Sequence, residues 1–293
     1  MKRIHHTAVL PRSTHIYFYC AVLLTALNSL SVAKDVIDFE NDIVPILTKG
    51  GCNAGACHGS AIGRGGFKLS LYGGNPIADY NAIVHDIRGR RINSARPRES
   101  LLFLKPTEHV SHGGGTLFDE ESISAKLILK WIAQGAQQTK TRSLISIKIT
   151  PRQFYSEQPK SPHHVRITAQ YDDGTTRDVT KWTVLEPEDE SAVEVDDHES
   201  RLIPLRRGRH IVTARYLTMV KPIELLIPLN TTKRPINKPP VYNFIDSDLN
   251  AALNTLRITP STQSTGGEFI RRLSLDLTGR LPSVSSVRTF LES

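Results

Sequence analysis

The sequence predicts a multidomain protein: a small, mostly helical domain, an all-β sandwich and an incomplete helical segment at the C-terminal end. Three observations support this division. Apolar residues recur at helical spacing within residues 34–140, alternate with polar residues within 141–232, and return to helical spacing within 241–293. A Pro-rich linker at 233–240 separates the last two parts. A chain of 293 residues, 39% hydrophobic and 23% charged, has the size and composition of about two globular domains.

Residues 1–33 have the pattern of an export signal. Lys2, Arg3 and Arg12 form a positive start, an apolar run covers residues 16–27, and small residues occupy 31–33. This pattern predicts an exported protein, in the periplasm or at the cell envelope. An uncleaved signal anchor is the alternative, and no other membrane span is predicted.

The charge gives little support to a nucleic-acid partner. The formal net charge is +8, and the first 33 residues contribute three basic residues and no acidic ones, which leaves +5 for the rest. The basic residues are scattered, with one local cluster at Arg88, Arg90 and Arg91. A solvated basic surface explains this better than a nucleic-acid site.

One short motif carries chemistry. Cys52 and Cys57 are the two cysteines outside the export signal, and His58 follows directly. Two thiols followed by an imidazole are the groups that attach a haem covalently and supply its proximal iron ligand. The usual motif has two residues between the cysteines, whereas this chain has four. We therefore predict one covalently attached haem c, with His58 as the proximal ligand.

The second axial ligand is expected to be a histidine. The one methionine beyond the chain start, Met219, lies in the β region. His112 precedes a Gly-Gly-Gly segment that could swing it over the iron, so it is the predicted distal ligand. His109 is the second choice and His85 the third. Two imidazoles give a lower reduction potential than a histidine and a methionine.

The local cluster of arginines is a weaker candidate for haem binding. Arg88, Arg90 and Arg91 could pair with the haem propionates. Two alternatives use the same cysteines without haem. Cys52 and Cys57 could form a disulfide, or could join His58 and His112 in a tetrahedral zinc site.

Helical signals flank the motif. A short helix is expected over residues 38–47, and a clear amphipathic helix begins at Glu121 or Ser122 and ends at Gly135. The expected inner face of this second helix consists of Ile123, Leu127, Ile128, Trp131 and Ile132.

Four short segments carry a resemblance to a known family, namely residues 42–47, 57–59, 99–102 and 131–136. Through them, residues 36–136 resemble the planctomycete-type cytochrome c domain. The family often has a Met-Pro-Pro segment before its last helix, where this chain has His112-Gly113-Gly114. The resemblance implies a small cytochrome c-like fold and a haem that carries electrons.

Residues 141–232 predict seven or eight short strands. Asp172-Asp173-Gly174 is a hairpin turn signal, and Trp182 is expected to fill the core. The segments 171–182 and 208–214 resemble the bacterial Ig-like group 2 domain. This resemblance implies a spacer or an adhesion module that contacts the cell envelope or a polysaccharide.

Three helices are expected in residues 241–293. The second is capped by Ser264 or Thr265 and the third begins at Pro282-Ser283. Residues 268–282 resemble the start of the uncharacterised helical domain that follows the cytochrome module in the same planctomycete proteins. That domain is longer, so we expect this segment to be a fragment of it.

Together these features predict an exported haem protein that transfers electrons or senses redox state, with a redox partner that the sequence does not identify. No acid–base constellation predicts catalysis. The alternatives are an extracellular binding module with a disulfide- or zinc-stapled N-terminal domain, and an accessory part of a larger exported enzyme.

Overall fold

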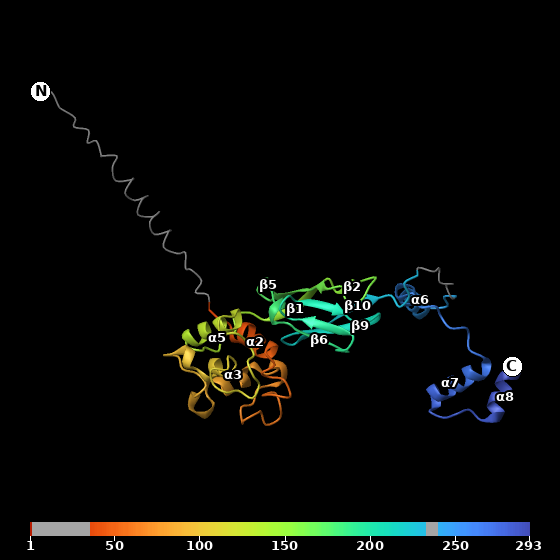
Figure 1. Cartoon of the computed structure of the whole chain (residues 1–293), viewed down its shortest axis with the longest axis horizontal. Coiled ribbons are helices and arrows are strands. Elements are labelled where there is room, and N and C mark those ends of the chain that lie inside the picture. Colours follow the sequence, from red (N-terminus) through yellow and green to blue (C-terminus); the bar gives the residue numbers. More distant parts are fainter. Residues whose placement is uncertain (2–35, 233–239) are drawn as a thin grey trace.

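The computed structural model describes Met1, residues 36–232 and residues 240–293. These residues form a mixed fold, with helices and loops first, a β-sheet region over residues 144–227, and helices at the C-terminal end (Figure 1). The predicted export signal and most of the Pro-rich linker lie outside the described residues. Within the described ranges, no helix is long and apolar enough to cross a membrane.

The first helical element matches the prediction for residues 38–47. A π-helical turn, η2 (Phe39–Ile43), continues directly into α2 (Val44–Lys49). The carboxylate of Asp38 caps it by accepting from the backbone N–H of Asn41 at 3.0 Å. Pro45 is the second residue of α2, where the fixed φ of proline suits the start of a helix. The helix ends at Gly50 and leads straight into the cysteine motif.

Three further helices complete this part: α3 (Pro76–Val84), α4 (Leu101–Leu104) and α5 (Ile123–Ala133). Helix α5 is capped by Ser122, as predicted, and buries Trp131 against Phe39 with 5.3 Å between ring centroids. Ile123 was expected on the same buried face but is 53% exposed. It lies about 140° around the helix from the buried Ile128, so it cannot share that face.

The β region contains three small sheets. Their strand orders are β1-β4-β5, β2-β10-β9-β6 and β3-β8-β7. All pairs are antiparallel except β2 with β10. The strands are β1 (Leu144–Thr150), β2 (Gln153–Tyr155), β3 (His163–His164), β4 (Arg166–Tyr171), β5 (Thr176–Asp178), β6 (Val184–Pro187), β7 (Val193–Asp196), β8 (Arg201–Pro204), β9 (Gly208–Tyr216) and β10 (Met219–Ile227).

The predicted turn and the alternating strands are confirmed, but the role of Trp182 is not. The turn at 172–174 joins β4 to β5, closed by the Gly174 N–H on the carbonyl of Tyr171 at 3.1 Å. Trp182 belongs to a short 3-10 turn rather than a strand, and it is half-buried with the guanidinium of Arg177 4.5 Å from its ring centroid. The large side chains that fill the core are Tyr171 and Tyr216.

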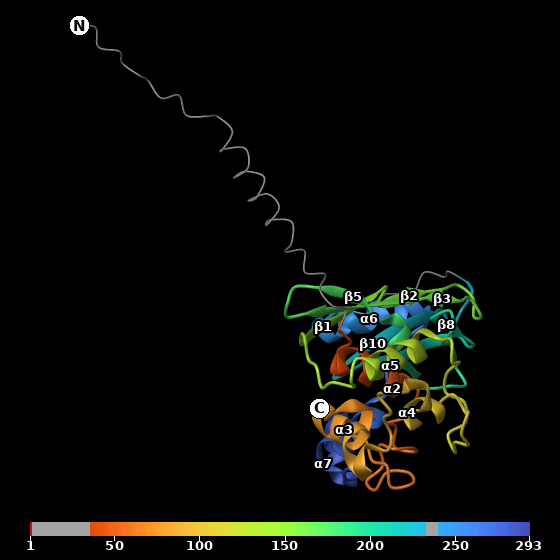
Figure 2. The same cartoon turned by 90° about the vertical axis from the view of Figure 1, so that its left-hand side faces the viewer.

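The helical part is docked onto the β region (Figures 1 and 2). One continuous cluster of buried apolar residues includes members from both. At the junction Arg177 forms an ion pair with Asp42, and the Tyr216 hydroxyl donates to the backbone carbonyl of Asn41 at 3.2 Å. The β region therefore supports the helical part directly, which the expectation of a spacer did not include.

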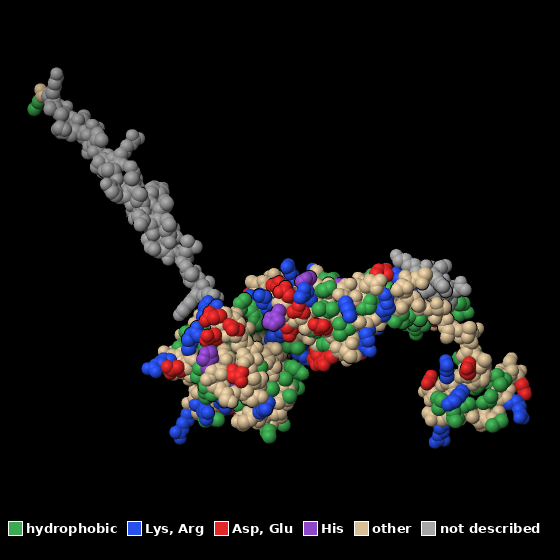
Figure 3. All heavy atoms as spheres, viewed as in Figure 1, with side chains coloured by type: hydrophobic (Ala, Val, Ile, Leu, Met, Phe, Trp, Pro, Cys, Tyr) green, Lys and Arg blue, Asp and Glu red, His purple; other side chains and the backbone are tan. Residues whose placement is uncertain are grey.

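The C-terminal helices are α6 (Phe244–Leu256), α7 (Gly266–Thr278) and α8 (Val284–Glu292). The predicted caps are present: Thr265 caps α7 and Ser283 caps α8. Helices α7 and α8 pack on each other through Phe269 and Phe290, whose ring centroids are 5.8 Å apart. Neither helix contains a buried residue, and hydrophobic side chains are visible on their surface (Figure 3).

Candidate functional site

The cysteine motif forms a compact loop at the end of α2. Gly51 adopts a positive φ of 70°, which turns the chain out of the helix. The Cys52 N–H donates to the carbonyl of Leu47 at 2.9 Å, and the His58 N–H donates to the carbonyl of Cys52, also at 2.9 Å. The second bond closes the loop across the four intervening residues. The longer spacing is thus accommodated without separating His58 from Cys52 along the backbone.

A buried hydrogen bond and a close backbone approach at a glycine hold this loop in its closed form. The Asn53 side chain is buried and donates to the hydroxyl of Thr48 at 2.8 Å, which ties the loop to α2. Gly59 follows the motif, and a methyl group built there would lie 2.1 Å from the carbonyl oxygen of Asn53. Because such an approach is impossible, only glycine fits at this position.

The loop lines one wall of a cavity of about 350 Å³. This is at the lower end of the range for small-molecule and cofactor sites, roughly 300–1,000 Å³. Cys52, Cys57, His58 and His112 all face it. Its apolar lining includes Leu47, Phe67, Leu69, Leu101, Leu102 and Leu117.

His58 presents one ring nitrogen to the cavity. Its Nδ1 lies 2.8 Å from the carbonyl oxygen of Phe67. Since a carbonyl can only accept, Nδ1 carries the proton and Nε2 keeps a free lone pair. Burial lowers the pKa of His58, hydrogen bonds to the backbone of Phe67 and Arg64 oppose this, and the nearby His112 and Arg91 add to the lowering. The ring is therefore neutral, as a metal ligand must be.

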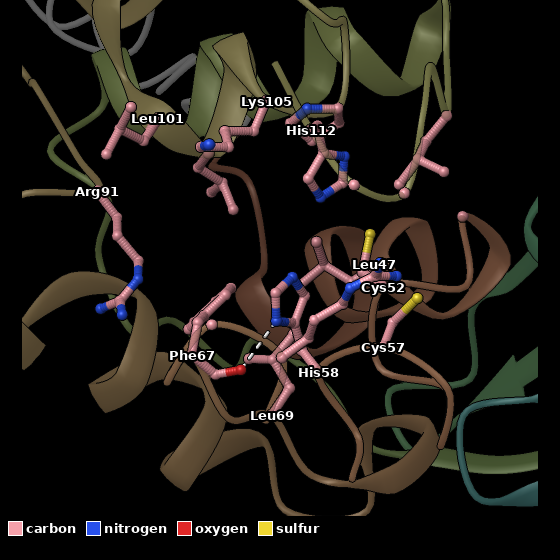
Figure 4. A pocket seen from close by; sticks show the side chains of 18 of the residues that line it. Leu47, Cys52, Cys57, His58, Phe67, Leu69, Arg91, Leu101, Lys105 and His112 are labelled. Carbon is pink, nitrogen blue, oxygen red and sulfur yellow. Dashed lines mark hydrogen bonds between the residues drawn. The ribbon is translucent and has the colours of Figure 1, made fainter. Parts of the chain in front are cut away.

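His112 faces His58 across the cavity (Figure 4). The ring centroids are 6.4 Å apart and the ring planes differ by 14°. The Nδ1 of His112 lies 3.2 Å from the carbonyl oxygen of Gly115, so the Nδ1 of this ring too carries a proton and donates to a backbone carbonyl. A metal ion bonded to two Nε2 atoms at about 2 Å each would hold the ring centroids roughly 6 Å apart. The observed spacing fits that arrangement.

The other histidines of this part do not line the cavity. His109 Nδ1 lies 3.1 Å from the Thr107 hydroxyl, and its Nε2 lies 3.3 Å from a carboxylate oxygen of Glu120. Both of its ring nitrogens are therefore engaged elsewhere. His85 packs edge-on against Tyr80, with 5.5 Å between ring centroids. Of the three histidines considered for the distal position, the structure brings only His112 to face His58.

The cysteines are free thiols in this structure. Burial, with a smaller contribution from Cys57, raises the pKa of Cys52 to about 12. In the described part of the chain, no three His, Cys, Asp or Glu side chains converge as a metal site would require. The described residues thus contain neither a bond between the two thiols nor a four-ligand zinc cluster.

Four cationic side chains line the cavity: Arg64, Arg90, Arg91 and Lys105. The Arg91 guanidinium is buried, donates to the carbonyl of Ala82 at 2.8 Å and lies 4.2 Å from the ring centroid of Phe67. In the view of Figure 4, Arg91 lies on one side of the gap between the imidazoles and the two sulfur atoms lie on the other.

Two of the three arginines predicted to pair with haem propionates lie at the cavity. Arg90 and Arg91 line it, whereas Arg88 does not. Arg64 and Lys105 line it too, although no role was predicted for either. Arg64 lies in the Gly-rich loop after the motif and Lys105 directly follows α4. Proximity to the motif was a usable signal for Arg64, but none existed for Lys105.

Comparison with known families assigns only the C-terminal end. Residues 244–293 match the family model PSCyt2, described as a protein of unknown function (DUF1549) and associated with planctomycete cytochromes c. The match covers α6, α7 and α8. A search of curated proteins found no match to this chain.

Proposed function

We propose that this chain is an exported c-type haem protein that transfers electrons or senses redox state at the cell envelope. The proposal rests chiefly on one observation: the imidazoles of His58 and His112 face each other across a cavity that is also lined by both thiols. The match of residues 244–293 to a cytochrome-associated family supports it independently.

The residues present fit a covalently held haem. Cys52 and Cys57 would attach it, His58 would be the proximal ligand and His112 the distal one. Arg91, across the gap from the thiols, and Lys105 would pair with its carboxylates. A bound haem supplies an iron that accepts and returns one electron.

The chain's own contribution is to orient the two imidazoles and to exclude water from the cavity. The carbonyls of Phe67 and Gly115 fix the tautomer and the angle of the two imidazoles. The leucine-rich lining keeps water from the centre, which affects its reduction potential. In the helical part we propose a cytochrome c-like domain, and in the β region an Ig-like domain that supports it and contacts the cell envelope.

The test is expression of the exported form in cells that mature c-type cytochromes. We expect haem staining to persist on a denaturing gel and a pyridine haemochrome spectrum typical of thioether-linked haem. Cys52→Ala and Cys57→Ala together should abolish the staining, while His109→Ala, which leaves the cavity intact, should not. Absence of covalent haem from the unmodified protein would refute the proposal. A zinc assay on the same sample then tests the metal alternative.

A further inference from the structure

The segment from Pro106 to Leu117 carries His112 and is closed by several contacts. At its base the Leu117 N–H donates to the carbonyl of Pro106 at 2.8 Å. Above the base, the Thr116 hydroxyl donates to the carboxylate of Glu108. The ammonium of Lys105, just outside the segment, donates to the carbonyl of Ser111 at 2.9 Å. These contacts tie the segment at both of its ends and near its middle.

The tip of the segment is a tight turn around His112. The Gly115 N–H donates to the carbonyl of His112 at 2.9 Å, and Nδ1 of the His112 ring donates to the carbonyl of Gly115. Backbone and ring are thus bonded to the same glycine. The orientation of the ring is consequently set within the turn itself, without a partner from the far wall of the cavity.

The two glycines inside the turn differ in their surroundings. A methyl group built at Gly114 would lie 2.9 Å from Cε1 of His112 and 3.4 Å from its Nδ1. The imidazole therefore lies directly against this glycine. For a methyl group at Gly113, the three nearest atoms would instead belong to the guanidinium of Arg64, with Nη2 at 3.1 Å. That guanidinium is the far end of a flexible, exposed side chain and can move aside.

From this geometry we infer that the segment 106–117 is a latch that holds His112 permanently facing His58, with Gly114 as its positioning residue. The inference rests on the proposed haem function and makes it more specific. With His58 and His112 both held toward a bound haem, the chain would leave no open position on its iron, so the protein would exchange electrons and would not bind small ligands such as carbon monoxide or peroxide. The Gly-Gly-Gly sequence serves the packing of a ring and not the swinging of a loop.

Gly114→Ala and Gly113→Ala form a matched pair that separates packing from flexibility. Both replace one glycine by alanine in the same turn, and neither position has a positive φ. If the glycines supplied only flexibility, the two variants would behave alike. If Gly114 positions the ring, only Gly114→Ala displaces His112 from the iron.

The measurement is carbon monoxide binding to the dithionite-reduced haem protein, with the spin state followed by absorbance and electron paramagnetic resonance. We expect the unmodified protein and Gly113→Ala to stay low-spin and to bind carbon monoxide slowly. Gly114→Ala should acquire a high-spin fraction and bind it at least about tenfold faster. His112→Ala serves as the fully open reference.

Two results would overturn the latch. One is equal behaviour of Gly113→Ala and Gly114→Ala, and the other is carbon monoxide binding by the unmodified protein as fast as by His112→Ala. Failure of the proposed function has a different outcome, namely no covalent haem in any variant. If haem is attached in all variants but Gly114→Ala changes neither the spin state nor carbon monoxide binding, the latch alone is refuted.

Discussion

His58 and His112 are oriented in the same way: in each ring Nδ1 donates to a backbone carbonyl, so Nε2 is the nitrogen left for the cavity. A carbonyl cannot rotate away as a side chain can, so each tautomer is set by the fold around it. The two rings are nearly parallel and 6.4 Å apart between centroids. At this scale the site is a pair of ligands already oriented toward a common point.

Replacing His112 by methionine tests its assignment as the axial ligand. Since a thioether favours the reduced metal, we expect His112→Met to raise the reduction potential and to keep the centre low-spin. His109→Met is the control, because His109 is bonded to Thr107 and Glu120 outside the cavity. A redox titration measures both. An equal shift in the two variants would argue against His112.

Among the elements, helix α3 is joined to the chain that follows the cysteine motif by one buried carboxylate. Asp79 accepts from the hydroxyl of Ser70 at 2.7 Å and also from its backbone N–H. Burial raises the pKa of Asp79, and the two hydrogen bonds from Ser70 oppose that rise. The element therefore depends on a charged group that is partly desolvated.

Asp79→Ala and Asp79→Asn should differ in stability. Alanine leaves a partly buried N–H and hydroxyl of Ser70 without this acceptor and should lower the free energy of unfolding by about 1–3 kcal/mol. Asparagine keeps one oxygen acceptor and should lower it less. Denaturant titration measures both variants, and equal losses would show that the acceptor is not what matters.

The pH dependence gives Asp79 a second signature. Its pKa is raised in the folded state, so the folded protein binds this proton more tightly than the unfolded chain. This contribution to stability is complete below the unfolded pKa, about 3.9, and is lost as pH rises through the folded value. The difference in unfolding free energy between the unmodified protein and Asp79→Asn should change across that window. A difference independent of pH would contradict the raised pKa.

For the whole molecule, the helical part and the β region share a core and a polar junction. Arg177 and Asp42 are 23% and 12% exposed, which leaves their ion pair mostly shielded from water. Removing one partner of a buried pair leaves the other charge uncompensated. The haem-binding part is therefore expected to depend on the β region for its stability.

Arg177→Ala should lower the free energy of unfolding by about 3 kcal/mol. Arg166→Ala is the matched control, because Arg166 and Asp178 are 75% and 56% exposed and should contribute less than about 1 kcal/mol. Both are measured by denaturant titration. Similar losses in the two variants would mean that the junction contributes no more than a surface pair.

The distribution of charge predicts which redox reagents react fastest. Arg64 and Arg90 line the cavity, Arg88 lies two residues before Arg90, and all three are exposed and without an ion-pair partner among the described residues. Other arginines of this part, such as Arg96 with Glu99, are paired. The cavity side is therefore the more positive one.

We expect the haem protein to exchange electrons faster with anionic hexacyanoferrate than with cationic hexaammineruthenium after correction for driving force. The advantage should shrink as salt rises. Arg90→Glu should reduce this rate advantage. Arg96→Glu makes the same change in charge away from the cavity and should reduce the advantage less. Stopped-flow kinetics measure these rates. An advantage that is insensitive to salt would contradict the electrostatic origin.

The sequence by itself determined the chemistry available and most of the local structure. Cys52, Cys57 and His58 are adjacent enough in the chain to be recognised together, and caps such as Ser122 and Thr265 act within one helical turn. Short-range patterns of this kind need no knowledge of distant contacts. The alternation of apolar residues likewise indicated the strands of the β region.

Only the tertiary structure decided which distant residues meet. His109 and His112 are three positions apart, yet only the fold of the segment 106–117 turns one toward His58 and bonds the other to Glu120. Lys105 lines the cavity, and Tyr171 and Tyr216 rather than Trp182 are the large buried side chains of the core. Gly114 packs against the ring of His112, and no local sequence pattern predicts this contact. Side-chain direction depends on backbone turns and on neighbours far along the chain, so spacing alone could not select among these residues.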